Sequence, residues 1–268
     1  MISINNNIVK KDNVKINYKN LYDYLYSRNF IYIPKLISYN DNSIELEYVE
    51  DIKTDNRLKI KDLIKIVALL HSKTSYLKEI TDYKYNKIYN NLINNIEYLS
   101  NYYNDLFNKF IIIPNQKPSQ LLLITNYSII NYSINYTKDK INTWYNNIKE
   151  NKKERVCLIH NNLSLEHFIK NTKEYLISWD NYIYDSPILD LYKLYKNESK
   201  NISLNELLDI YQDIFKLTIN ELDLLYILIS MPEKVELTDN EYNNCIKLRK
   251  LINYLNNTYD GINKATKV

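Results

Sequence analysis

Apolar residues from about residue 58 onwards recur at the three- and four-residue steps of an amphipathic helix. The segment "RLKIKDLIKIVALLHSKT" (57–74) places most of its apolar residues on one face and predicts a first long helix. The asparagine-rich segment 83–111 keeps the same period, which favours a second long helix over disorder. A third helix is predicted from Pro118 towards Ile148, because proline suits the first turn of a helix. Shorter helical patterns follow at 187–196, 204–216, 222–230 and 239–255.

The first 50 residues have a different pattern, in which short apolar runs alternate with polar breaks. "NNIVKK" reads as a strand, and the runs on either side of 40–42 read as a strand pair joined by a turn that asparagine and aspartate favour. One helix is predicted within 17–30. A second β-rich patch, 156–180, contains "VCLIH" and "YLISW" between polar turns. The chain is therefore predicted to be α+β, with a strand-rich unit, a helical section, a β insert and a helical tail.

A single glycine, Gly261, limits the chemistry that the chain can perform. A P-loop, a dinucleotide-binding fingerprint and a kinase glycine-rich loop each need several glycines close together, so we expect none of them. The enrichment in Asn, Lys, Ile and Tyr resembles what an AT-rich bacterial genome imposes through its codons. The net charge of +3 is spread along the chain, so nucleic acid is not an expected partner.

The cysteines and the hydropathy bear on the cellular compartment. Cys157 and Cys245 are too few for a disulfide framework and lie outside metal-ligand spacings. No apolar run is long enough to span a membrane, and "MISINNNIVKKDN" lacks the apolar core of a signal peptide. We therefore expect a cytoplasmic protein without a membrane partner.

The most informative segment is "LIHNNLSLEHFIKNTKEYLISWDNYIYDSPILDL", which begins at Leu158. It resembles the catalytic segment of aminoglycoside phosphotransferases and choline kinases, a protein kinase-like superfamily that includes the spore-coat kinase-like proteins. In that family a strand ends in His-Gly-Asp-Leu, an Asn follows, an Ile-Asp-Trp or Ile-Asp-Phe strand comes later, and Asp-x-Pro-x-x-Asp-Leu opens the next helix. The positions that match without gaps are His160, Leu163, Trp179, Asp185, Pro187, Asp190 and Leu191.

The resemblance implies a protein kinase-like two-lobed fold. Its reduced N-terminal β lobe would be 1–50, and its mainly helical C-terminal lobe would be 51–268 with the β insert inside it. "YVED" (48–51) would be the hinge, and the glycine-rich hairpin is expected to be shortened or missing. The loop His and the Asp of the following helix have architectural duties in the family, and these fall on His160 and Asp190.

The positions that carry the family's chemistry are replaced. The catalytic Asp, which receives or orients the attacking hydroxyl, is Asn162 here, and an amide cannot take the proton. The magnesium-binding Asn is His167, although magnesium prefers oxygen ligands to imidazole. The magnesium-binding Asp of Ile-Asp-Trp is Ser178, which carries no negative charge. The motifs are therefore degenerate.

Other residues are candidates to compensate. Asp180 lies two residues beyond the serine position and would face the same side if the segment were an extended strand. Glu166 is a second acidic candidate within the loop. The family's ATP-contacting lysine has Lys10 as the first candidate and Lys11 as the next, and Asp23 is the acid that the following helix offers. A solvated strand end is the alternative interpretation of these lysines.

Two functions from different classes remain open. The favoured hypothesis is a kinase-like protein that has lost phosphotransfer and acts as a binding or regulatory pseudokinase, with a protein or small-molecule partner and no cofactor. The alternative is an active ATP-dependent small-molecule phosphotransferase with a rearranged metal site, which would use ATP and magnesium. A weaker third is an accidental resemblance in a mixed α/β adaptor. His71, at the end of the first long helix, is assigned no chemistry.

Overall fold

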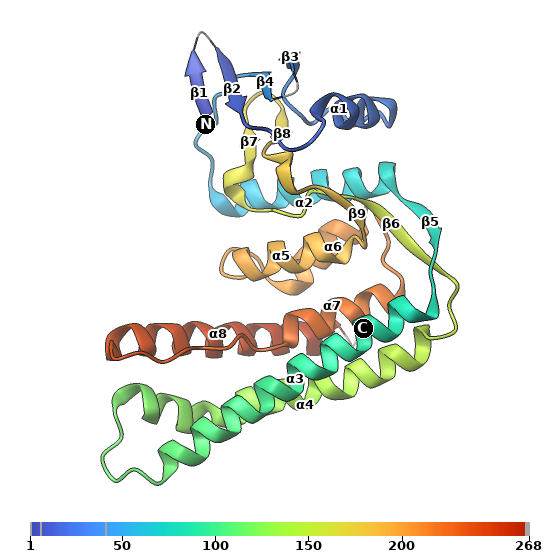
Figure 1. The fold of residues 1–268 in the computed structure, drawn as a ribbon. Coiled ribbons are helices and arrows are strands. Elements are labelled where there is room, and N and C mark those ends of the chain that lie inside the picture. The colour runs from blue at the N-terminus through green and yellow to red at the C-terminus, as the bar shows by residue number, and fades with distance from the viewer. Residues whose placement is uncertain (1, 6, 41, 266–268) are drawn as a thin grey trace. The chain divides into compact units, whose positions relative to one another are not determined.

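The computed structural model describes residues 2–5, 7–40 and 42–265, and the chain divides into two compact units (Figure 1). The first unit contains residues 1–78, 155–202 and 206–216. The second unit contains residues 79–154, 203–205 and 217–268. Each unit is thus assembled from segments far apart in the sequence. A lobe boundary at residue 50 stays a prediction.

The first unit begins with a four-stranded antiparallel sheet of order β1-β2-β4-β3. Its strands are β1 (Ile2–Asn5), β2 (Ile8–Asp12), β3 (Leu36–Tyr39) and β4 (Ser43–Glu47), and α1 (Tyr18–Ser27) lies between β2 and β3 in the sequence. The predicted pair β3–β4 is confirmed. Its turn is closed by Asn40, whose side-chain oxygen accepts hydrogen bonds from the backbone N–H groups of Asn42 (3.0 Å) and Ser43 (2.8 Å).

Asparagine takes the place of glycine at tight points of this backbone. Among the described residues, positive φ angles occur only at Asn7, Asn13, Asn29, Asn161 and Ser178. Asparagine tolerates the left-handed region better than other residues with a Cβ, because its short polar side chain can bond locally. Asn29, for example, follows the end of α1, where Phe30 N–H bonds back to Leu25 O at 2.9 Å. The lack of glycines therefore does not prevent sharp turns.

The rest of the first unit includes one long helix, α2 (Asn56–Thr74). The strand β6 (Lys153–Ile159) lies between β5 (Tyr76–Glu79) and β9 (Ile183–Asp185) in a three-stranded sheet, and β7 (Phe168–Lys170) pairs with β8 (Glu174–Leu176). The helices α5 (Ile188–Glu198) and α6 (Leu204–Gln212) follow β9. Short 3₁₀ turns at Leu165–His167 and Trp179–Asn181 connect the strands.

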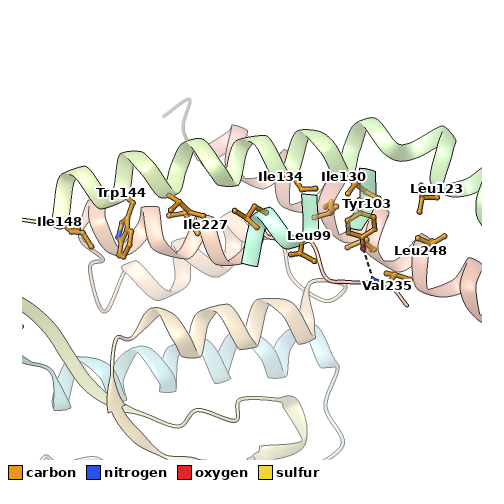
Figure 2. Close-up of a cluster of buried hydrophobic side chains, with 14 of the residues drawn as sticks. Leu99, Tyr103, Leu123, Ile130, Ile134, Trp144, Ile148, Ile227, Val235 and Leu248 are labelled. Carbon is orange, nitrogen blue, oxygen red and sulfur yellow. Dashed lines mark hydrogen bonds between the residues drawn. The ribbon is translucent and has the colours of Figure 1, made fainter. Parts of the chain in front are cut away.

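The second unit is a helical assembly of α3 (Asp82–Ile111), α4 (Pro118–Ile148), α7 (Ile219–Ser230) and α8 (Glu241–Ala265). The helices α3 and α4 run side by side as a long hairpin (Figure 1). Figure 2 shows the apolar core, in which Ile130, Ile134 and Trp144 of α4 face the other elements. Within it the Tyr103 hydroxyl accepts a hydrogen bond from Val235 N–H at 3.1 Å and donates to Glu233 O.

The single glycine allows two buried segments of the second unit to approach closely. A Cβ at Gly261 of α8 would lie 2.8 Å from the Leu204 Cβ, which is closer than two carbon atoms can pack. Gly261 has no positive φ, since the described backbone contains no glycine in that region. Its role is therefore to save space between helices and not to permit an unusual turn.

The α+β class and the helices predicted from the apolar period are confirmed, and α4 has no break. Three bounds were wrong by three residues or more, because the helix predicted at 204–216 ends at Gln212, the helix predicted at 222–230 begins at Ile219, and the last helix extends beyond 255 to Ala265. The strand expected through 175–179 was also wrong. It ends at Leu176, because Ser178 takes a left-handed conformation (φ 65°) that no strand accommodates. No helix within 2–5, 7–40 and 42–265 is long and apolar enough to cross a membrane.

Candidate functional site

The loop after β6 is held by a buried carboxylate at the start of α5. Asp190 is fully buried, and its two oxygens accept hydrogen bonds from the backbone N–H groups of His160 (2.8 Å) and Asn161 (2.7 Å). Pro187 sets the start of α5, so Asp190 lies in the first helical turn, where a negative charge is favourable. This is the contact that the family resemblance implies for Asp190.

His71 of α2 is the third partner of this carboxylate. Its Nε2 lies 3.2 Å from Asp190 Oδ2, and its Nδ1 lies 2.7 Å from the Tyr211 hydroxyl of α6. Burial alone raises the pKa of Asp190, but the hydrogen bond and charge of His71, together with His160, bring that pKa below its usual value. The Asp190 carboxylate is therefore a stable anion that fixes one end of the loop.

Two further side chains of α5 bind the same loop. The Lys193 ammonium donates to the backbone oxygen of Asn161 at 2.7 Å and also to its side-chain oxygen, and the Asn197 amide donates to Leu163 O at 3.1 Å. Residues 190, 193 and 197 are spaced by three and four, so they lie on one face of the helix. Asn161 itself has φ 62° at the position of the family's glycine. One face of α5 thus determines the loop conformation.

His160 and Trp179 join the loop to the segment after β8. The His160 Nε2 lies 2.7 Å from Ile177 O, and its ring meets the Trp179 ring edge-on at 4.9 Å. The Trp179 indole N–H donates to Leu176 O at 3.0 Å, and its ring packs against Phe30. Both residues are buried, and burial lowers the pKa of His160. A neutral imidazole therefore fills a structural position here.

Asn162 and His167, at the loop positions that carry chemistry in the family, bond to each other within the loop. Asn162 is partly exposed, and its backbone oxygen lies 2.7 Å from the His167 Nδ1. The Ser164 hydroxyl lies 3.3 Å from the same nitrogen. The His167 ring therefore closes the loop onto its own backbone through Nδ1. Glu166 is exposed on the intervening 3₁₀ turn.

Asp180 lies on the Trp179–Asn181 turn and not on an extended strand, so the condition under which it would face the same side as Ser178 is not met. Its carboxylate still has a defined environment. The Lys11 ammonium of β2 pairs with Oδ2, and the Tyr18 hydroxyl of α1 donates to Oδ1 at 3.1 Å. Burial raises the pKa of the Tyr18 hydroxyl, and the charge and hydrogen bond of Asp180 raise it further. Three elements thus converge on one carboxylate.

Lys10, the first candidate from the sequence for the ATP-contacting lysine, does not pair with Asp180, whereas its neighbour Lys11 does. Lys10 and Lys11 are neighbours on β2, so their side chains point to opposite faces of the sheet. Lys10 makes a loose surface pair with Asp12 at 3.9 Å. Asp23 of α1 is exposed, and Lys11 pairs with Asp180 instead. The structure therefore pairs Lys11, and not Lys10, with an acid, and that acid is Asp180 instead of Asp23; a role of either lysine in binding ATP stays a prediction.

The hinge-like segment after β4 is fixed to the β7–β8 hairpin. Asp51 accepts hydrogen bonds from Lys170 N–H (2.9 Å) and from the Lys59 ammonium (2.5 Å), and Ile52 N–H donates to Lys170 O (2.7 Å). Burial acts to raise the pKa of Asp51, but the bonds from Lys59 and Lys170 lower it overall. A polar hollow of about 330 Å³ lies beside this segment, and Glu47 and Glu50 contribute to its lining.

Solved structures of known phosphotransferases have the same fold. An aminoglycoside phosphotransferase from Alicyclobacillus acidocaldarius superposes with a TM-score of 0.64 over 98% of this chain and 92% of that chain, at 8% identity. A glucosamine kinase in complex with glucosamine, ADP and inorganic phosphate gives 0.53 over 97% and 77%, at 10% identity. An AMP-bound spectinomycin phosphotransferase gives 0.51 over 94% and 87%, also at 10%. No protein-family model matches the sequence, and no curated protein matches it.

These likenesses establish a class of fold. The chain has the kinase-like α+β fold of aminoglycoside phosphotransferases and small-molecule kinases, with a small sheet region and a large helical region, so the predicted fold class is confirmed. At such low identity the likeness is one of fold alone, and function has to be argued from the site.

The donor set does not fit the magnesium ion that such chemistry uses. Asn162 offers an amide, Ser178 a hydroxyl, and the His167 Nδ1 is already engaged by a carbonyl oxygen. Magnesium prefers several hard oxygen ligands in octahedral geometry, with anionic carboxylates among them. Across the described part of the chain, no group of three or more His, Cys, Asp and Glu side chains is placed to hold a metal ion.

Four residues at the site were not predicted from the sequence to belong to it. Lys193 and Asn197 could have been found, because they follow Asp190 at helical spacing. His71 lies four residues after Val67, on the buried face of α2, which marks it as a buried polar group that needs a partner. Tyr18 has no such signal, because tyrosine is common throughout the chain.

Proposed function

We propose that this kinase-fold chain has lost phosphotransfer and acts as a binding or regulatory pseudokinase. One observation carries the proposal. The acid and the lysine that would face nucleotide phosphates, Asp180 and Lys11, are paired with each other, and Tyr18 occupies the second carboxylate oxygen. A carboxylate that already has a cation and a donor gains less from a metal ion than a free one does.

The loop geometry supports the same proposal. Asn162 stands where a proton acceptor is needed, and an uncharged amide supplies neither the basicity nor the charge. The loop is nevertheless held by hydrogen bonds with Asp190, Lys193 and Asn197. A domain that keeps the contacts supporting this loop but lacks the reacting groups is expected to act by binding and not by catalysis.

The alternative is an active ATP-dependent phosphotransferase with a rearranged metal site. The observation in its favour is the same cluster, since a phosphate-binding lysine and a metal-binding acid must lie close together. In that case the Lys11–Asp180 pair would open when ATP and magnesium bind, and Asp180 would be a metal ligand.

A thermal-shift titration with ATP separates the two functions. A ligand that binds only the native state at 100 times its Kd stabilises by about 2.7 kcal/mol, or roughly 5–10 °C in Tm for a chain of this size. The pseudokinase proposal expects a Tm change below about 1 °C at millimolar ATP, with or without magnesium. A magnesium-dependent increase in wild type that is lost in Asp180→Ala would overturn it.

A gain-of-function variant provides the matched positive control. Asn162→Asp, His167→Asn and Ser178→Asp together restore the three residue types of the family pattern. The corresponding neutral control is Asn162→Ala, His167→Asn and Ser178→Asn, which lacks the two new carboxylates. We expect a magnesium-dependent ATP shift in the first variant and none in the second, because only carboxylates supply the anionic ligands.

If the chain does not bind ATP, its function depends on the partner that it binds instead. We propose a cytoplasmic role in which a protein or a small molecule binds this domain in place of ATP. We also propose that the chain is related to the spore-coat kinase-like branch of the superfamily. If wild type binds no nucleotide while the restored variant does, the fold is competent and the natural sequence has replaced the chemistry.

A further inference from the structure

A hollow of about 220 Å³ lies within the second unit, between the middle of α4, the end of α7 and the C-terminal half of α8. Its lining includes Ile129, Tyr132 and Tyr136 from α4 and Tyr259 and Ile262 from α8. All eleven described residues that line it are uncharged, although 25% of the chain is charged. Because transfer of a charge into such surroundings is unfavourable, this lining selects for an uncharged ligand.

One hydroxyl at this hollow lacks a partner. The Tyr136 hydroxyl is buried and has no hydrogen-bond partner within the described residues. Burial raises the pKa of Tyr136, and the nearby Tyr226 and Asp223 raise it further, so it remains an O–H donor at neutral pH. By contrast, the Ser133 hydroxyl of the same lining donates to Ser230 O. Buried donors are nearly always satisfied, so an unpaired one indicates a missing acceptor.

Two aromatic rings lie at the same lining and are open to solvent. Tyr132 and Tyr259 pack edge to face with ring centroids 4.8 Å apart, and they are 49% and 42% exposed. Exposed rings of this kind offer apolar contact area at small cost in side-chain entropy. Together with Ile129 and Ile262 they would contact a flat apolar body from several directions.

We propose that this hollow is a binding site for a small uncharged ligand with an aromatic or apolar body and one carbonyl-type acceptor, and that the buried Tyr136 hydroxyl turns into the hollow to donate a hydrogen bond to that acceptor. The site lies apart in sequence from residues 160–190, and none of its lining residues belongs to that segment. The inference therefore goes beyond the proposed loss of phosphotransfer and does not depend on it.

The test uses a matched pair of probes and the full chain. The probe is 4-fluoroacetophenone, and its control is 1-fluoro-4-isopropylbenzene, which has nearly the same shape but no acceptor. Binding of both is followed by fluorine NMR line broadening. We expect saturable millimolar binding of the ketone to wild type. In Tyr136→Phe, the Kd of the ketone should rise about fivefold, as for loss of one hydrogen bond, while that of the hydrocarbon changes less than about twofold.

A blocking variant tests the location. Ser128 lies at the exposed edge of the lining, so Ser128→Phe should obstruct the hollow without disturbing the core and raise the ketone Kd by about tenfold. Thr143→Phe, an exposed change on the same helix outside the lining, should leave it unchanged. The proposal is overturned by the absence of saturable binding, by equal binding to Ser128→Phe and wild type, or by an equal effect of Tyr136→Phe on both probes.

Discussion

Asp190 and Asp180 are ten positions apart in the first unit, yet they occupy opposite kinds of environment. The Asp190 side chain is 0% exposed and bonds to two backbone N–H groups and to His71. The Asp180 side chain is 38% exposed and bonds to two side chains, Lys11 and Tyr18. One carboxylate fixes backbone geometry, and the other neutralises a partly solvated cation.

The difference predicts which of the two carboxylates the fold can lose. A buried carboxylate that satisfies backbone donors cannot be removed without leaving those donors unpaired. A carboxylate on a partly exposed turn, such as Asp180, has no such role in folding. Replacing a carboxylate on such a turn is therefore expected to cost little stability, whereas loss of the support for the loop would cost much.

The strongest test of this contrast is Asp190→Ala. The change leaves two buried N–H groups and His71 without their acceptor, so we expect the free energy of unfolding to fall by about 3–5 kcal/mol. Urea denaturation measures it. Asp209→Ala, at an exposed position of α6, should change the value by less than about 0.5 kcal/mol. A loss below about 1 kcal/mol for Asp190→Ala would show that the loop is held by other contacts.

The pH dependence of stability tests the neutral state of His160. Its pKa in the folded chain is lower than the ordinary value of 6.5, so the unfolded chain binds more protons between the two values. This contribution to stability is fully present above about pH 6.5 and is lost as the pH falls from there through the folded pKa. The free energy of unfolding should therefore fall between pH 7 and 5, by up to about 1.4 kcal/mol per pH unit for one proton.

His160→Asn removes this titration, so its slope between pH 7 and 5 should be shallower than that of wild type. Because His71 and His167 remain in both proteins, the difference between the slopes isolates His160. Equal slopes would mean that burial does not hold this imidazole neutral.

The fold could be predicted from the sequence because the patterns that indicate it are periodic. The apolar spacing of α2, α3 and α4 marked three long helices, and the spacing of His160, Asp185, Pro187 and Asp190 pointed to the kinase-like topology. Such patterns reflect burial, which acts at every turn of a helix. The apolar spacing therefore remains detectable although asparagine, lysine and tyrosine are very common in the chain.

The site was only partly predictable because it depends on single dihedral angles and on side-chain direction. Nothing in "YLISWDN" shows that Ser178 has a positive φ, and that angle ends the strand and turns Asp180 towards Lys11. The choice between Lys10 and Lys11 depends on the register of β2, which a run of two lysines does not reveal. Long-range contacts, such as that between His71 and Asp190, need the fold before they can be seen.

A smaller effect is expected at the Asp180 cluster. Lys11→Met removes a partly exposed ion pair, so the free energy of unfolding should fall by no more than about 1 kcal/mol. Lys10→Met, on the opposite face of β2, should have an effect below about 0.5 kcal/mol. Urea denaturation of both variants gives the comparison. A loss above about 2 kcal/mol for Lys11→Met would make Asp180 as structural as Asp190 and would weaken the contrast between the two carboxylates.

The smallest effect is expected for Ser178→Asn, and it has the opposite sign. Asparagine and aspartate occupy the left-handed region more readily than serine, so Ser178→Asn should stabilise the chain by about 0.5 kcal/mol, whereas the β-branched Ser178→Val should destabilise it by about 1–2 kcal/mol. Ser178→Asp has the same backbone preference as Ser178→Asn but adds a carboxylate near Asp180. If magnesium stabilises Ser178→Asp and leaves Ser178→Asn unchanged, the backbone at this turn can place a carboxylate to bind magnesium, and serine at this one position prevents it. If neither responds, the surrounding residues have also diverged, and the family's chemistry cannot be restored at this single position.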